Sequence, residues 1–249
     1  MLRVLKHLMV LAVVPGSLPA QTLEKRVSAQ GDGTVRLSFP ARPGTCGGEA
    51  SGISLRHTNE EWQPDCQPRL VRVALRLSSG LVHSVRTYVG GHWLPDSSAA
   101  DLGTVSPREA AFYFITLAER TGGRRLAGDP LLPSVLADSV TIWPSLVRIA
   151  RRPRISREIR GRAVFWLGQA AGAAAGGALD SIATDDTGDR EVRQQAIFAL
   201  SQRSSDEGVP ALIRIARTNA DSELRKSALF WLGQTEDPRA LDLFEEILK

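Results

Sequence analysis

The chain of 249 residues is long enough for one or two folded domains, and its 43% apolar and 23% charged residues argue against extensive disorder. The formal net charge is +4. From residue 157 to the end, however, there are 12 basic and 15 acidic residues, so this part lacks the basic excess of a nucleic-acid-binding surface.

The first twenty residues have the layout of a secretory signal peptide. Arg3 and Lys6 supply positive charge, the apolar run 8–14 follows, and Leu18-Pro19-Ala20 offers a cleavage site. The run is far shorter than the about 20 apolar residues that span a bilayer, so we expect no stable membrane insertion after cleavage. The prediction is a signal peptide over 1–20 and a periplasmic or extracellular protein; the alternative is a buried N-terminal helix.

Residues 21–100 have the pattern of a small β domain. Apolar and polar residues alternate over 35–39 and again over 71–77. The turn residues 78–80 then lead into the strand-like run 81–89, which predicts a β-hairpin. Residues 90–100 are expected to link this domain to the helices that follow.

Two cysteines, Cys46 and Cys66, lie in the loop-like stretch 41–68. In an exported protein an even, low number of cysteines favours a disulfide, and only one pairing is available. A metal site is the alternative, but neither cysteine has a closely spaced cysteine or histidine partner. We therefore expect the β domain to be stapled by a Cys46–Cys66 disulfide.

The helical part begins with signals for capped helices. Ser106 precedes Pro107 and Glu109, which predicts an N-cap followed by a helix up to residue 120. The stretch 129–140 is expected to hold a degenerate helix leading into Trp143.

Three segments of 13 residues repeat along the C-terminal part. They begin at Arg157, Arg190 and Ser222, and the first and third are identical at eight positions. Leucines at 146, 179 and 212 each start a Leu-x-x-Ile-Ala pattern, which predicts a second helix in each unit. A period of 32 or 33 residues with two helices per unit is typical of a stacked repeat array.

Local chemistry marks the helix ends in each unit. Ser156, Asp189 and Asp221 occupy one column directly before the first helix, where a side-chain oxygen caps free N–H groups. Gly168 and Gly233 follow the last leucine, where a left-handed residue often ends a helix. The pair at 176–177 is expected in a turn between helices.

The motif Glu-(Ile/Val/Leu)-Arg, followed by Ala-x-Phe-x-Leu-Gly and a leucine-rich second helix, resembles bacterial HEAT repeats, particularly the short variety of phycobilisome lyase-like proteins. The resemblance covers 143–249. It implies a short α-solenoid of HEAT-type helix pairs, which we expect over 101–249. With the small disulfide-stapled β unit before it, the expected fold class is mainly α.

Some side chains recur in register, and two interpretations remain open for them. The arginines could be a basic ladder that binds a partner, or a structural ladder that joins repeats through carboxylates such as Glu158, Glu191 and Glu223; the structural interpretation is favoured. The aromatic residues are predicted to be core. The arginines are Arg160, Arg193 and Arg225, and the aromatic residues are Trp166, Phe198 and Trp231.

The resemblance implies that the second helices line a concave surface on which a partner binds. The polar residues of these helices are therefore the candidate partner-binding residues, with a solvated surface as the alternative. The candidates are Arg148, Arg151, Asp180, Arg214, Arg217 and Asp242.

The sequence offers no pattern for catalysis, for a cofactor or for a metal ion. The histidines lack ligand spacing, and no nucleophile-elbow motif is present. We therefore expect a non-catalytic scaffold that binds a protein, of unknown oligomeric state. The alternatives are a lyase-like enzyme, by analogy with the phycobilisome lyases, and binding of acidic envelope polymers by a solvated basic surface of the hairpin (Arg72, Arg76 and Arg86), with the repeats as a spacer.

Overall fold

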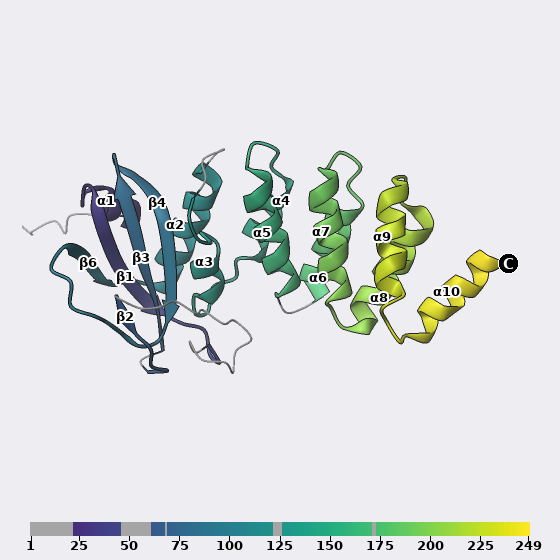
Figure 1. Cartoon of the computed structure of the whole chain (residues 1–249), viewed down its shortest axis with the longest axis horizontal. Coiled ribbons are helices and arrows are strands. Elements are labelled where there is room, and N and C mark those ends of the chain that lie inside the picture. The colour runs from purple at the N-terminus through teal and green to yellow at the C-terminus, as the bar shows by residue number, and fades with distance from the viewer. Residues whose placement is uncertain (1–21, 46–60, 68, 122–125, 171–172) are drawn as a thin grey trace, which may run out of the picture.

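The structure is a computed structural model that describes residues 22–45, 61–67, 69–121, 126–170 and 173–249. It is elongated: a small β-sheet with its covering helices lies at one end, and a row of helices extends from it (Figure 1). The predicted signal peptide lies outside the described residues.

The sheet has the strand order β4-β3-β1-β6. Its central strand β1 (Gly33–Pro40) pairs antiparallel with β3 (Leu70–Ser78) and parallel with β6 (Ala99–Thr104). Strand β4 (Leu81–Val89) pairs antiparallel with β3 and completes the predicted hairpin. Ser79 and Gly80 connect the two strands with φ of 51° and 71°, the left-handed pair that a two-residue hairpin turn requires.

Three helices accompany the sheet: α1 (Leu23–Ser28), α2 (Pro107–Arg120) and α3 (Leu132–Leu136). The N-cap of α2 is Ser106, as predicted, and its hydroxyl accepts from the N–H of Glu109. The rings of Phe39 and Phe114 lie 6.5 Å apart, so α2 covers the sheet. Both β6 and α2 therefore belong to the β unit, which extends beyond the expected boundary at residue 100 because β6 pairs with β1.

The opposite surface of the sheet carries the arginines of the predicted basic surface. Only Arg76 is exposed as expected. Arg72 donates to the carbonyls of Gly90 and Gly91, and Arg86 forms a bidentate ion pair with Glu61. The solvated basic surface is thus a wrong prediction for two of its three arginines, because the neighbouring segments cover them.

Those segments are β2 (Trp62–Gln63) and β5 (His92–Trp93), which pair with each other across this surface. The Trp93 ring lies 4.8 Å from the guanidinium of the buried Arg36, at a distance typical of a cation–π contact. Burial lowers the pKa of Arg72 and outweighs the charge of Asp101, which raises it.

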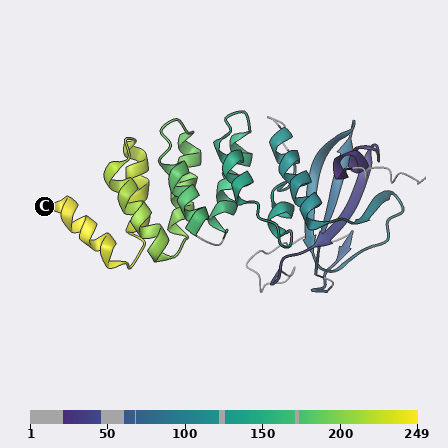
Figure 2. The same cartoon turned by 180° about the vertical axis from the view of Figure 1, so that it is seen from behind.

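Helix pairs follow along the array, in the order that the repeats predict. The first helices are α5 (Arg157–Gly168), α7 (Arg190–Ser201) and α9 (Ser222–Leu232). The second helices are α6 (Ala173–Ala183), α8 (Ser205–Thr218) and α10 (Pro238–Leu248). Helix α4 (Trp143–Arg151) precedes them in the row of the second helices and packs against α5 and α6, whereas the five-residue α3 packs against α2 and β3. Figure 2 shows the same row from behind.

Two predictions about glycines are wrong. Gly176 and Gly177 lie inside α6, not in a turn. Gly168 is the last residue of α5 and Gly233 caps α9 with φ of −66°, so neither ends its helix in the left-handed conformation. Close packing explains why position 168 is a glycine: a Cβ there would lie 3.0 Å from the Cβ of Ala199 in α7.

The predicted caps are confirmed, and they also join the repeats. Ser156, Asp189 and Asp221 each accept a hydrogen bond from the first turn of their own helix. Arg160 of α5 donates to Asp189 at 3.1 Å, and Arg190 of α7 donates to Asp221 at 2.7 Å. The caps Asp189 and Asp221 therefore also accept a hydrogen bond from the preceding repeat.

The recurrent arginines have a structural role, but not with the expected glutamates. Arg160 and Arg193 are almost fully buried. Arg193 donates to the carbonyl of Ala183, which ends α6, and to the side chain of Asn219, the C-cap of α8. Arg225 of α9 donates to the carbonyls of Asn219 and Ala220, at the end of the preceding unit. Glu158, Glu191 and Glu223 instead pair with Arg162, Arg157 and Lys226, respectively.

One hydrophobic core extends from the β unit into the array. It runs without interruption from Leu23 to Leu243. At the junction, Trp166 of α5 donates to Asp129 at 2.8 Å, and Arg162 donates to the carbonyl of Gly128 at 3.0 Å. The β unit is thus packed against the first repeat and not tethered by a linker.

Of the two cysteines in the predicted disulfide, one lies among the described residues. Cys66 lies on the exposed segment beside Gly90, where a Cβ on Gly90 would come within 3.3 Å of the Cys66 Cα. Its expected partner, Cys46, lies outside the described residues.

Candidate functional site

The predicted binding residues of the second helices lie along one side of the array and pair with neighbouring helices. Arg148 of α4 donates to Glu119 of α2 at 2.9 Å, and Arg151 donates to Ser181 of α6. Asp180 of α6 is paired with Arg214 of α8. These contacts connect α2, α4, α6 and α8.

The same pattern reaches the last helix. Arg217 of α8 is paired with Glu246 of α10. Asp242 is exposed and lines a hollow between α8 and α10 together with Arg214 and Arg217. Five of the six candidates therefore connect one unit to the next, which we call the ionic ladder (Arg148, Arg151, Asp180, Arg214 and Arg217).

The first helices present a different surface. Phe165, Phe198 and Phe230 occupy one column of the repeat and are 48%, 41% and 59% exposed, respectively. The prediction that Phe198 belongs to the core is therefore wrong, whereas Trp166 is buried and Trp231 is partly buried. Phe198 lies one position before the column of the two tryptophans, so its side chain points away from the core.

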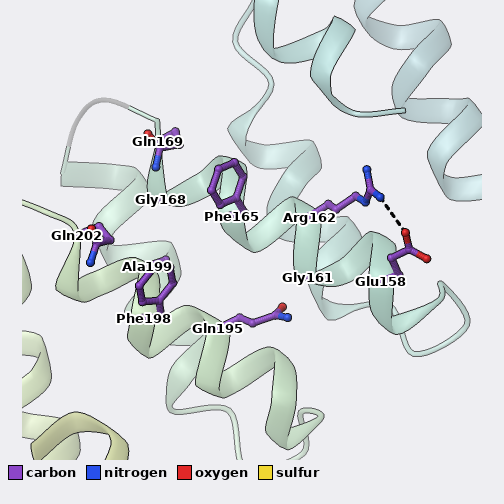
Figure 3. Close-up of a pocket in the computed structure, with 10 residues that line it drawn as sticks. All are labelled: Glu158, Gly161, Arg162, Phe165, Gly168, Gln169, Gln195, Phe198, Ala199 and Gln202. Carbon is purple, nitrogen blue, oxygen red and sulfur yellow. Dashed lines mark hydrogen bonds and ion pairs between the residues drawn. The ribbon is translucent and has the colours of Figure 1, made fainter. Parts of the chain in front are cut away.

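A groove of about 600 Å³ lies between α5 and α7, flanked by two of these phenylalanines (Figure 3). Phe165 projects from α5 and Phe198 from α7, with glutamines at both ends of the groove. We call it the α5–α7 groove. Its lining residues are Glu158, Gly161, Arg162, Phe165, Gly168, Gln169, Gln195, Phe198, Ala199 and Gln202.

The groove exists because one column of the repeat is not uniform. Trp166, Ala199 and Trp231 occupy equivalent positions in α5, α7 and α9. Trp231 lies between α7 and α9, with its ring 5.0 Å from that of Phe198. Between α5 and α7 the equivalent residue is Ala199, whose single methyl leaves the corresponding space open.

Small residues on the two helices also make the groove deeper. A Cβ on Gly161 would overlap the side chain of Gln195, so this glycine allows the carboxamide to lie across α5. Gly168 meets Ala199 at the other end, as described above. Any larger side chain at these positions would reduce the groove or separate the two helices.

The polar groups of the groove carry no unbalanced charge. Glu158 and Arg162 are paired at 2.8 Å. Gln169, Gln195 and Gln202 are exposed, and each carboxamide offers both donors and an acceptor. The groove is thus suited to non-covalent binding of an apolar group with neutral polar groups beside it.

The part of the chain that the structure describes shows neither a metal site nor a membrane-spanning helix. Within those residues, no group of three or more histidine, cysteine, aspartate or glutamate side chains is arranged to hold a metal ion. None of their helices combines the length and apolar character needed to cross a membrane.

The groove was not among the sequence predictions, although a signal for it was present. The aligned repeats show alanine at 199 where both other units have tryptophan. A missing large side chain in an otherwise conserved stacking position predicts unfilled space, because the helices on either side are still held apart by their other contacts.

Comparison with known proteins identifies the array. Residues 144–229 and 181–249 match the family described as HEAT repeats. No curated protein and no solved structure gives a match.

Proposed function

Because residues 144–249 are HEAT repeats, which generally act as protein-interaction scaffolds, we propose that the protein is a non-catalytic scaffold whose α5–α7 groove holds a protein partner. The observation that carries this proposal is the pair of exposed phenylalanines, Phe165 and Phe198, on either side of an apolar groove. Large exposed apolar side chains gathered in one place mark interaction sites.

The ionic ladder is the weaker candidate for the main binding surface. Its arginines are paired with neighbouring helices, so a partner would have to displace those contacts or bind around them. Exposed ion pairs of this kind contribute little each, and their regular spacing suits a role in holding the repeats in register. Asp242 has no ion-pair partner among the described residues and stays a candidate contact.

Site-specific photo-crosslinking tests the proposal. A photoreactive amino acid placed at Gln202, on the rim of the groove, is expected to capture a defined protein in cells of the source organism. The matched control is Gln234, which occupies the same column just after the end of α9 and is also exposed but lies outside the groove. A third position for the photoreactive amino acid is Asp242, on the other side of the array. Equal capture at Gln202 and Gln234, or capture only at Asp242, would contradict the assignment of the groove.

Export and the disulfide remain parts of this proposal. The apolar run 8–14 behind two basic residues supports a signal peptide, and the solvent-exposed position of Cys66 suits a covalent link to the preceding loop. Intact mass before and after alkylation, with and without reductant, is expected to show alkylation of Cys46 and Cys66 only after reduction. Alkylation without reductant would exclude the disulfide.

A further inference from the structure

The space between the next two first helices, α7 and α9, shows which side chain fills such a groove. Between α7 and α9, the indole of Trp231 packs against Phe198 of the preceding repeat, with ring centroids 5.0 Å apart. It also meets Phe230 of its own helix at 5.0 Å and a steep angle of 77°. One indole is thus held between two phenylalanines, in the tilted and edge-on arrangements that aromatic rings prefer.

The α5–α7 groove repeats this arrangement without the indole. Phe165 corresponds to Phe198, and Phe198 in turn corresponds to Phe230. Both phenylalanines line the groove, and Ala199 stands where the tryptophan would begin. The two phenylalanines that flank an aromatic ring are therefore present in this groove, but position 199 of α7 supplies no ring to lie between them.

We infer that the α5–α7 groove accepts an aromatic side chain of about the size of an indole, presented by a polypeptide partner. This inference rests on the proposed function and specifies its ligand. The paired charges of Glu158 and Arg162 favour an uncharged occupant. Gln195 and Gln202 lie at opposite ends of the groove, where their carboxamides can bond the peptide groups that flank the inserted ring.

A short peptide is the probe for a direct test. The full chain, labelled for NMR, is titrated with the capped pentapeptide Gly-Ser-Trp-Ser-Gly, with Gly-Ser-Ala-Ser-Gly as the control. The tryptophan peptide is expected to shift the amide signals of Gly168, Ala199 and Gln202 with a Kd on the order of 1 mM, as befits a single anchor. The alanine peptide should leave them unchanged.

Three variants locate the binding. Ala199→Trp supplies the missing indole from the chain itself and is expected to abolish binding. Phe165→Ala removes one wall and should weaken binding about tenfold, the upper end of what one aromatic pair contributes. Phe112→Ala is the control, because Phe112 of α2 is also 48% exposed but lies outside the groove; it should bind the peptide normally.

Several outcomes would overturn the inference. These are equal binding of the two peptides, full binding by a folded Ala199→Trp variant, and binding of free indole as tight as that of the tryptophan peptide. The last would indicate a site for small molecules. If Ala199→Trp fails to fold, normal binding by Phe165→Ala has the same meaning.

The crosslinking experiment keeps this inference separate from the proposed function. Capture at Gln202 that persists in the Ala199→Trp variant would overturn the aromatic occupant but leave the scaffold function standing. Loss of capture in that variant supports both.

Discussion

Asp189 performs two tasks at a single repeat boundary. One carboxylate oxygen accepts from the N–H of Glu191 and caps α7, and the other accepts from Arg160 of the preceding repeat and lies 3.3 Å from Arg157. Burial by itself would raise the pKa of Asp189, but hydrogen bonding to Glu191 and Arg160, with the charges of Arg157 and Arg160, outweighs it and lowers the pKa to about 2. A capping residue thus also contributes to stacking.

Two substitutions separate these tasks. Asp189→Asn keeps a good cap and loses the charge, so it should lower the free energy of unfolding by about 1 kcal/mol. Asp189→Ala loses both and should cost about 2 kcal/mol. Denaturant unfolding followed by circular dichroism measures both values. Glu245→Gln, at an exposed site on α10, serves as the control and should be neutral. Equal losses for both variants at Asp189 would mean that the cap contributes nothing, and an Asp189→Asn variant as stable as the native protein would mean that the charge contributes nothing.

The lowered pKa of Asp189 also predicts a pH dependence with a definite sign. Because the pKa in the folded protein (about 2) is below the ordinary value of 3.8, the unfolded state binds the proton first as the pH falls. The stability due to this charge is therefore present above about pH 4 and lost between about pH 4 and pH 2. The difference in stability between the native protein and Asp189→Asn should vanish over this window, and a difference that persists at about pH 2 would contradict the prediction.

At the scale of single elements, α6 is a helix that its own sequence disfavours. It contains Gly176 and Gly177 in succession, and each glycine costs a helix interior about 1 kcal/mol relative to alanine. The helix forms because its apolar residues, among them Leu179 and Ile182, are buried against the neighbouring helices. Tertiary packing overrides the local preference, which is why the sequence alone placed these glycines in a turn.

The two glycines of α6 provide a matched pair of substitutions. Gly177 is exposed and a Cβ there would meet nothing within 4 Å, so Gly177→Ala should raise the free energy of unfolding by about 0.5–1 kcal/mol. A Cβ on Gly176 would lie 3.2 Å from a carboxylate oxygen of Glu207, so Gly176→Ala should gain less or lose stability. Thermal unfolding of both variants decides; an equal gain for the two would show that packing around Gly176 is unimportant.

Element positions in the array could be predicted because each signal is local and recurs. The capping column at 156, 189 and 221 and the leucines at 146, 179 and 212 placed the helices correctly. The strand β6 was missed because Ala99–Thr104 contains few β-branched or large apolar residues. Its pairing with β1 joins residues far apart in the sequence, and no local sequence pattern predicts it.

For the whole molecule, the sequence indicated which units exist but not how they meet. The junction combines a shared apolar core with long-range contacts, such as that of Trp166 with Asp129, between residues 37 positions apart. The charge pairs of the second helices were likewise hidden, because Asp180 and Arg214 come from different repeats and share no motif. The groove followed from what one repeat lacks, which only a comparison of the repeats with one another can show.

Exposed ion pairs join successive repeats on both sides of the array. On the first helices they include Arg190 with Asp221, and on the second helices Arg217 with Glu246. The screening length falls from about 10 Å at 0.1 M salt to about 3 Å at 1 M, so salt weakens both sets of contacts. The apolar core still holds the helices together, so we expect the array to lengthen slightly with salt and not to come apart.

Small-angle X-ray scattering measures that lengthening. The maximum dimension of the native protein should increase between about 0.05 M and about 1 M salt. The double variant Arg214→Gln and Arg217→Gln should show a smaller increase, and a native protein that is insensitive to salt would contradict this. Because Arg157 of α5 pairs with Asp189 and Glu191 of the next repeat, dissolved ions would also set the separation of α5 and α7 and thus the width of the groove between them.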